Sequence, residues 1–466
     1  MTLAIVAAVY FGAVLLLAWS GYRRTRSNAD FLVAGRSLGP LLGGATLAAT
    51  QISAGTFVGT VGLHYLSGVS FVWVWPGAWL GWFVSAIFVA PRLRAAGVLT
   101  VPEYCERRFG SRALRGIAAA LIVIAYSIYL VAQYKASGII VSAVTGWPAW
   151  MGIALILAST TLYSLAGGLH GGARIDLLQS AIMIVGLAGA VPYLLSAVGG
   201  VEQLGRQLSQ IDPRLVGWYY HWREVVAFAA AFGLSLAATP LEITRFMAMR
   251  SAASARYAIG VAYIVQAIVG ISVMFIGLSM RALFPDLPSP DMASSVMAAH
   301  VLTPIAGAVL LVAAFSAIMS TVNAILLIGG ASLAHDLYAA FLRPRATERE
   351  RLRANRVAIL MLAVVPVVFA LGGSALVQFI VLAQANLIAS AFFAPVVIGL
   401  NWGRASAAAA IAAMIAGPLV CTGWSLASGP PLGVDAIFAG VGVNVVVFIG
   451  VSLLWPPSKT LPSSAR

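Results

Sequence analysis

The feature that most constrains this chain is a succession of apolar stretches, each roughly 20 residues long, the length a helix needs to cross a bilayer. These stretches make 61% of the 466 residues hydrophobic and leave only 9% charged. A soluble protein of this size cannot bury so much apolar surface. The sequence therefore predicts an all-α integral membrane protein.

A search along the sequence for such stretches predicts thirteen membrane spans. We expect the first to remain as a helix, because no basic residue precedes it and the charges "RRTR" follow it, unlike a signal peptide. The spans lie near residues 3–22, 40–66, 69–91, 116–143, 148–167, 175–198, 222–244, 256–283, 303–331, 356–373, 376–401, 405–428 and 434–456.

The distribution of positive charge predicts the orientation. With the N-terminus outside, 23 of the 28 Lys and Arg residues fall on the cytoplasmic side, four fall outside, and Lys135 lies within a span. This excess follows the positive-inside rule, so we predict an N-out, C-in topology in the cell membrane. The net charge of +14 is thereby assigned to topology, and no nucleic-acid partner is expected.

No catalytic motif accompanies the spans. The chain has no phosphate-binding GxxxxGK[ST] loop, no HExxH and no Cys/His cluster with metal spacing, and its two cysteines, Cys105 and Cys421, predict no disulfide framework. We therefore expect a single membrane domain that is not an enzyme. An ion gradient is its expected energy source, with no obligatory protein partner.

Two spans carry interruptions that weaken a helix. The second contains "TQISAGT" near its middle, and the seventh contains "AATPLE", where Pro240 removes a backbone donor. The two spans are five helices apart and so run in opposite directions. Matched breaks of this kind predict an inverted-repeat transporter with a binding site at the membrane midplane. The alternative is that Gly and Pro are simply common in membrane helices.

Hydroxyl groups on the ninth span provide a partner for the first break. Ala317, Ser320 and Thr321 lie at i, i+3 and i+4, on one face of the helix. Two hydroxyl oxygens, with carbonyls freed where the second span unwinds, would make a cage of neutral oxygens suited to a small monovalent cation. The alternative is that these hydroxyls bond to the preceding turn or pack against small residues.

Seven strings along the chain, in this order, resemble motifs of the sodium:solute symporter family, which includes sodium-coupled proline, sugar, sialic-acid and pantothenate carriers. They are "NADFLVAGRSLGP" (28–40), "SAGTFVGTVGLHYLSG" (53–68), "LTVPEYCERRFG" (99–110), "YSLAGGLHGGARIDLLQ" (163–179), "TPLEITRFMAMRSAASAR" (239–256), "SAIMSTVNAILLIGGASLAHDLY" (316–338) and "APVVIGLNWGRAS" (394–406). The resemblance implies a LeuT-type fold with two inverted five-helix repeats. Its divisions would be an extra helix and loop (1–39), the two repeats (40–198 and 222–401) and two final helices (405–456).

The resemblance also implies a sodium site. Its ligands would be the carbonyls of Ala49, Ile52 and Ala317 and the hydroxyls of Ser320 and Thr321. Asp176 matches a family aspartate beneath this site that is linked to sodium release or to a second sodium. Where some members have two further hydroxyls, this chain has Asn323 and Ala324, so one sodium per cycle is expected.

Structural roles are the alternative interpretation of the acidic residues near these motifs. Asp176 lies beside Arg174 and could equally cap a helix or form an ion pair there. We assign Glu242, with Arg245 and Arg250, to a loop pair at the membrane interface. Asp336 is read as the end of the ninth span.

The resemblance to the family also implies which residues contact the solute. Ser53, Thr56, Phe71 and Trp75 match positions that touch solute, and Gln51 stands where proline carriers have an essential aspartate. Sugar carriers have an acidic residue at position 75 and an acid–amide pair at positions 55 and 56. This chain has Trp75, Gly55 and Thr56 at these positions, which weakens the case for a sugar as the solute. Gln51 in place of the aspartate weakens the case for proline.

Lys135 completes the candidate solute site. An ionisable residue inside the membrane indicates function, here as a partner for a solute carboxylate, as a basic residue on this helix is in some sialic-acid carriers. The alternative is that its long side chain extends to the interface. We thus expect a sodium-coupled symporter for an organic acid or amino-acid-like solute, with a proton-coupled or uncoupled carrier, or a sensor, as alternatives.

Overall fold

The computed structural model describes residues 2–23, 27–372, 375–427 and 433–457, and these residues are helical throughout apart from connecting segments. Their one extended pairing is an isolated bridge between Leu38 and Met249. Arg24, Arg26, Lys459 and Arg466, which entered the charge count, lie outside the described residues, as do the last residues of the predicted spans 356–373 and 405–428.

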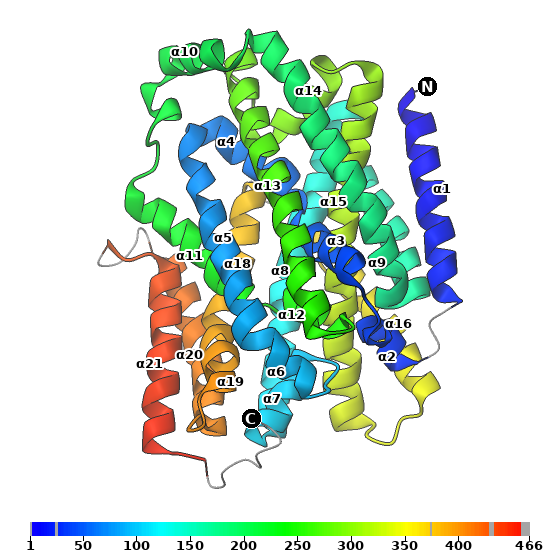
Figure 1. Cartoon of the computed structure of the whole chain (residues 1–466), viewed down its shortest axis with the longest axis vertical. Coiled ribbons are helices and arrows are strands. Elements are labelled where there is room, and N and C mark those ends of the chain that lie inside the picture. Colours follow the sequence, from blue (N-terminus) through cyan, green and yellow to red (C-terminus); the bar gives the residue numbers. More distant parts are fainter. Residues whose placement is uncertain (1, 24–26, 373–374, 428–432, 458–466) are drawn as a thin grey trace.

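The helices follow one another along the chain with short connections (Figure 1). The longer ones are α1 (Thr2–Tyr22), α3 (Pro40–Gln51), α5 (Val74–Val84), α8 (Arg112–Thr145), α9 (Ala149–Val198), α10 (Val201–Ile211), α11 (Trp222–Ala238), α13 (Ala252–Leu283), α15 (Pro304–Ala331), α16 (Glu348–Val364), α18 (Val377–Phe392), α20 (Ala407–Ser425) and α21 (Ala436–Leu454). The short ones are α2 (Asn28–Val33), η1 (Ala34–Arg36), η2 (Gly55–Thr60), α4 (Val61–Ser67), η3 (Gly68–Trp73), η4 (Ser85–Val89), α6 (Ala90–Ala95), α7 (Val101–Phe109), η5 (Pro213–Val216), α12 (Pro240–Ala248), η6 (Pro290–Met292), α14 (Ala293–His300), η7 (Ser332–Leu342), α17 (Val367–Ala370), η8 (Phe393–Ile398) and α19 (Gly399–Asn401).

The predicted interruption in the second span is a true break between α3 and η2. Ile52 leaves the helix in an extended conformation (φ −74°, ψ 103°), and the helical path resumes at Ala54. Local polar groups hold the break: the Thr56 hydroxyl accepts from the Ser53 amide at 3.3 Å, and the Ser53 hydroxyl accepts from the Gly55 amide at 3.0 Å. Ser and Thr side chains thus replace the ladder bonds that the helix loses here.

The seventh predicted span is also broken. α11 ends at Ala238, Thr239 is extended (φ −69°, ψ 127°), and α12 starts at Pro240 with a bend of 41° between the two helices. Proline is favoured at a helix start because its missing donor is not needed there. Both breaks predicted from the sequence are therefore confirmed.

The predicted number of thirteen spans is not confirmed. Among the described residues, nine helices are long and apolar enough to cross a membrane, or ten if α11 and α12 count as one span. The difference has structural causes: the range 40–66 is divided at Ile52 and its second part continues into the next predicted span as Gly55–Ala95, while Ile5–Gly21 and Ala149–Leu165 are shorter apolar helices. The ranges 148–167 and 175–198 both lie in α9, where non-helical Gly168 (φ 53°, ψ −154°) marks a kink between two helices. The orientation in the membrane stays a prediction. α1 begins at the same end of the molecule as α10, whereas α21 ends at the opposite end, where α6 and α7 also lie (Figure 1).

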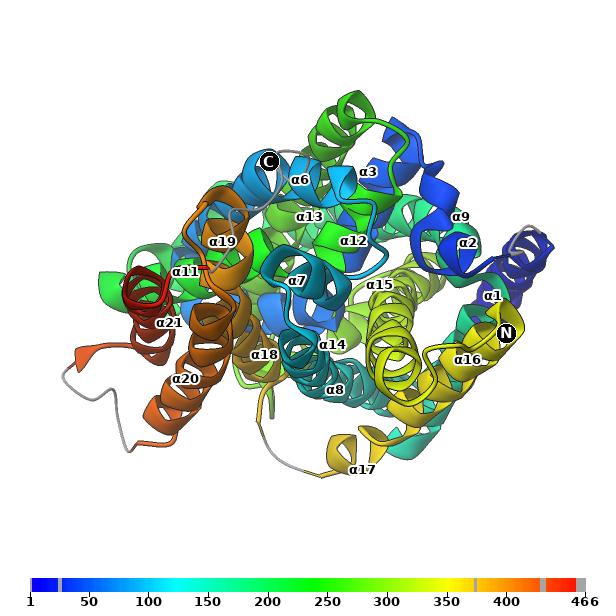
Figure 2. The ribbon, with the colours of Figure 1, turned by 90° about the horizontal axis from the view of Figure 1, so that it is seen from below.

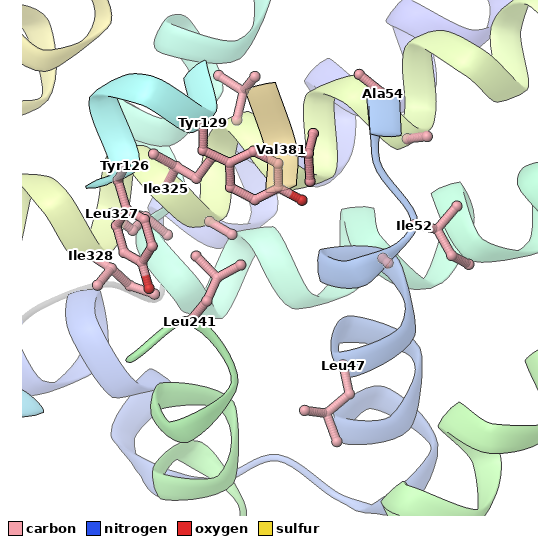
Figure 3. Close-up of a cluster of buried hydrophobic side chains, with 14 of the residues drawn as sticks. Leu47, Ile52, Ala54, Tyr126, Tyr129, Leu241, Ile325, Leu327, Ile328 and Val381 are labelled. Atoms are coloured by element: carbon pink, nitrogen blue, oxygen red, sulfur yellow. The ribbon is translucent and has the colours of Figure 1, made fainter. Parts of the chain in front are cut away.

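The centre of the bundle is formed by the broken helices and α15. α15 and η7 together form the most buried of these spans, and α1, α16, α20 and α21 lie at the periphery when the molecule is seen from below (Figure 2). The break at Ile52 packs into the main hydrophobic core, in a cluster with Tyr129 of α8 and Val381 of α18 (Figure 3). Polar groups exposed by the break are thereby held away from lipid, where unpaired backbone groups are costly.

Candidate functional site

The first candidate site lies where α15 passes the break. The Ser320 hydroxyl oxygen is 2.8 Å from the carbonyl oxygen of Ala49 and 3.0 Å from that of Ala317. The Thr321 hydroxyl donates to the carbonyl of Thr50, the next residue of α3, at 3.3 Å. The structure thus brings four of the five predicted sodium ligands together. The fifth, Ile52, is the residue at which α3 ends, and all five residues are fully buried.

This cluster offers neutral oxygens alone. Hydroxyl and carbonyl oxygens are ligands that hard cations prefer, and a site without a carboxylate suits a single positive charge. Within the part of the chain that the structure describes, no group of three or more His, Cys, Asp or Glu side chains is placed to hold a metal ion. The chemistry of the donor set therefore fits a small monovalent cation.

Asp176 lies in the interior of α9 rather than at a helix end. Its side chain is 1% exposed and accepts a hydrogen bond from the hydroxyl of Thr46, one turn before Ala49 on α3. Arg174 instead donates to Ser20 of α1 at 3.3 Å. The alternative interpretation of Asp176 as a capping residue or a partner of Arg174 is therefore wrong, because Asp176 lies inside the helical segment that follows the kink at Gly168 and its carboxylate contacts Thr46.

A cavity opens beside the second half of the break. A water-sized sphere can enter about 70 Å³ of it, on the order of five water molecules, which is room for a compact solute. None of the described residues that line it has a charged side chain. The residues lining it are Gln51, Ser53, Gly55, Thr56, Thr60, Phe71, Val74, Trp75, Ala78, Trp79, Trp82, Tyr129, Phe232, Leu236, Gln266, Gln378 and Val381.

Five of the six predicted solute residues lie in this wall: Gln51, Ser53, Thr56, Phe71 and Trp75. The aromatic side is extended by Trp79 and Trp82. Trp75, Trp79 and Trp82 follow one face of α5, and none of their indole N–H groups has an acceptor in the described residues. The cavity therefore has an aromatic wall with unpaired donors opposite a polar wall at the break.

Lys135 does not reach this cavity. Its ammonium group donates to the carbonyl of Ala375, ahead of α18, and it lines two other hollows on the outer side of α8. At about 100° per residue, Lys135 lies about 240° around α8 from Tyr129, which does line the cavity. The structure therefore does not support a solute-binding role for Lys135.

Gln133 is a residue of the site that the sequence reading passed over. Its side-chain oxygen accepts from the backbone amide of Ala54 at 3.0 Å, the residue at which the helical path resumes. Gln133 follows Tyr129 by four residues and so lies on the same face of α8. The sequence signal for Gln133 was a polar side chain one helical turn from an aromatic residue within an apolar span.

Glu242 and Arg245 were assigned to the membrane interface, and this assignment is wrong. Both are 0% exposed, in the first two turns of α12 directly after the second break. Glu242 accepts a hydrogen bond of 2.5 Å from the side-chain amide of Gln51. The bend at Pro240 turns the first residues of α12 into the core, an effect that a hydropathy pattern does not show.

Helices broken at a buried binding cavity define the class of secondary transporters, which move a solute by opening the cavity to each side of the membrane in turn. A sequence profile of the sodium:solute symporter family matches residues 31–417. The chain belongs to this family of multi-pass membrane transporters.

Relatives along the whole chain agree with this assignment. The osmoregulated proline transporter OpuE of Bacillus subtilis is 28% identical over 96% of this chain and 93% of its own length. The sodium/proline symporter of Escherichia coli is 28% identical over 94% of this chain and 91% of its own length.

Solved structures show that the fold is shared more widely. A sodium-coupled sialic acid symporter in a substrate-bound, outward-open state superposes with a TM-score of 0.85 at 17% identity, covering 99% of both chains. A nucleobase-cation-symport-1 family transporter gives a TM-score of 0.59 at 15% identity, covering 95% of this chain and 98% of its own. The expected LeuT-type fold is thereby confirmed at the level of overall architecture.

Proposed function

We propose that this protein imports a compact organic solute, either an organic acid or an amino-acid-like molecule, together with one sodium ion per cycle. Sodium would bind to the carbonyls of Ala49, Ile52 and Ala317 and to the hydroxyls of Ser320 and Thr321. The observation that carries the proposal is the position of Ser320, within hydrogen-bond distance of carbonyls from both α3 and α15. A cation there would hold the broken helix against α15.

One sodium per cycle is supported by the surroundings of Asn323. Its side-chain oxygen accepts from the Ser164 hydroxyl at 2.7 Å, and Ala324 offers no side-chain oxygen. Asp176, hydrogen-bonded through Thr46 to the helix that carries Ala49, is proposed to take part in sodium release.

The solute would occupy the cavity between the aromatic wall and the break. A carboxylate can accept from the unpaired indole N–H groups of Trp75, Trp79 and Trp82, while Ser53, Thr56 and Gln51 face it from the other wall. The proline carriers among the relatives support an amino-acid-like solute, whereas the position of Lys135 removes one argument for a simple organic anion.

Uptake into proteoliposomes tests this proposal. A panel of labelled amino acids, monocarboxylates and sugars is offered under an inward sodium gradient, or under a pH gradient without sodium. Sodium-driven uptake that is lost in Ser320→Ala/Thr321→Ala supports the proposal. Ser272→Ala is the matched control, because this buried hydroxyl only bonds back to Ile268 within α13. Uptake driven by the pH gradient alone would identify a proton-coupled carrier, and binding without uptake would identify a sensor.

The proposed topology places thirteen spans with the N-terminus outside and the two repeats at residues 40–198 and 222–401. Single cysteines in a background without Cys105 and Cys421 test it by labelling from each side of the membrane. We expect α10 to be labelled from outside and α7 from inside, and the reverse result would contradict the proposed orientation.

A further inference from the structure

A buried carboxylate lies directly behind the solute cavity. Glu242 is fully buried in the first turn of α12, where the helix N-terminus favours negative charge, and one carboxylate oxygen accepts from the side-chain nitrogen of Gln51. Its other oxygen has no hydrogen-bond partner in the described residues. Gln51 is the last residue of α3 and lines the cavity, so the contact joins the two helix breaks at the solute site.

The charge of Glu242 is only partly balanced. Arg245, one turn further along α12, is close enough to interact electrostatically with both Glu242 and Asp176. None of its guanidinium nitrogens has a hydrogen-bond partner in the part of the chain that the structure describes. Two carboxylates therefore share one guanidinium, and the cluster keeps one negative charge when all three groups are ionised.

The contact also fixes how Gln51 presents its amide. The –NH₂ group of Gln51 donates to Glu242, the orientation that an ionised carboxylate requires because it has acceptors only. The amide oxygen is then the atom of this side chain that is left for the solute. Without Glu242, either end of the amide could face the cavity.

We propose that Glu242 is a specificity-determining positioning residue that acts through Gln51 to select solutes with a cationic or N–H-bearing nitrogen. This inference rests on the proposed function and narrows it, from an organic acid or amino-acid-like solute to one that carries an amine. The oxygen of Gln51 accepts from that nitrogen, and the negative charge behind it strengthens the bond. The aromatic wall suits the same group, since aromatic faces attract cations.

The test uses pairs of compounds that differ in the nitrogen. L-proline and cyclopentanecarboxylate share a five-membered ring and a carboxylate, and L-alanine and propionate form a second pair. Each affinity is measured by calorimetry on the purified full-length protein in saturating sodium, at one neutral pH. The quantity of interest is the ratio of affinities within a pair, because a change in folding alone would shift both members equally.

Three variants give opposing expectations. Glu242→Gln frees the amide of Gln51, and the amine preference should fall at least about tenfold, the typical weight of a charge-assisted hydrogen bond. Gln51→Glu places two carboxylates in contact and should bind poorly. The exchange Gln51→Glu/Glu242→Gln restores one carboxylate and one amide across the contact and should recover the preference. Glu202→Gln, an exposed residue of α10, is the matched control.

The inference is overturned if Glu242→Gln keeps the ratio within twofold, or weakens both members of a pair equally. It is also overturned if the wild-type protein binds only compounds without nitrogen, although the proposed function then stands. If no solute is taken up with sodium, the proposed function fails and the inference fails with it. Should Glu242→Gln not fold, Gln51→Met removes the same acceptor and must abolish the same preference.

Discussion

The crossing of α5 and α11 depends on glycines that leave no room for a side chain, and Gly81→Ala is the sharpest perturbation of it. A Cβ atom at Gly81 would lie 2.1 Å from the carbonyl oxygen of Gly233, and one at Gly77 would lie 2.5 Å from that of Ala229. Small residues four apart are a common device for close helix packing in membranes. The two helices also carry opposite parts of the cavity wall, Trp75 on α5 and Phe232 on α11.

The expected cost follows from this distance. Acceptable contacts to a Cβ begin at 3.0 Å or more, so the helices must separate by about 1 Å near Gly81. Overpacking of this kind costs about 1–3 kcal/mol, because both partners are backbone and cannot rotate away. The better helix propensity of alanine returns about 1 kcal/mol at most. Since the same shift displaces the aromatic wall, solute affinity should fall together with stability.

The assay is thermal unfolding in detergent followed by tryptophan fluorescence, with Gly189→Ala of α9 as the control. A Cβ at Gly189 has nothing within 4 Å, so this variant should be as stable as the parent or slightly more stable. Gly81→Ala should melt a few degrees lower. Equal melting temperatures for the two variants would refute the argument that this crossing is limited by backbone contact.

Three further changes test separate contacts. Gln133→Leu leaves the amide of Ala54 without its acceptor, so binding of sodium and solute should weaken together in calorimetric titrations, at a cost of about 1–3 kcal/mol. Lys135→Met should leave solute affinity within twofold, and a larger loss would return Lys135 to the solute site. Burial acts to raise the pKa of Glu103 in α7, but the hydrogen bond and the charge from His335 act in the opposite direction and outweigh it. The pKa is therefore lowered to about 2. The stability that Glu103 supplies is therefore present above pH 4.5 and is lost as the pH falls toward 2, so Glu103→Gln should show a flatter decline of melting temperature over that range.

Residues that interrupt a regular pattern could be interpreted from the sequence. Pro240, and the polar residues after Thr50, disturb long apolar spans, and a break is the direct physical consequence of each. Ser320 and Thr321 lie one turn from Ala317 on a single face, so their convergence on α3 also follows from helix periodicity. The contact between these hydroxyls and the broken helix could be predicted for this reason, while the sodium ion proposed to bind there stays a prediction.

Long-range packing decided the features that the sequence did not reveal. Glu242 and Arg245 look like interfacial residues because they follow a proline and precede a basic loop, yet the 41° bend buries them completely. Lys135 lies on the wrong side of α8, which only the neighbours of that helix determine. For Asp176 the sequence left two interpretations open, because the position of the kink at Gly168, which leaves Asp176 inside the following helical segment, is set by packing.

The break at Ile52 offers a way for the proposed sodium site and the proposed solute site to be coupled. Ala49 and Thr50 direct their carbonyls to α15, whereas Gln51 and Ser53 line the cavity, so five consecutive residues would serve both proposed sites. An extended segment between two helices is the most easily deformed part of either wall, and a ligand that orders it at one end lowers the entropy cost of ordering it at the other. Such coupling must be reciprocal: the factor by which sodium tightens solute binding equals the factor by which solute tightens sodium binding. Glu242 of α12 holds Gln51 from the other broken helix, so α12 has a direct contact with the segment through which this coupling would pass.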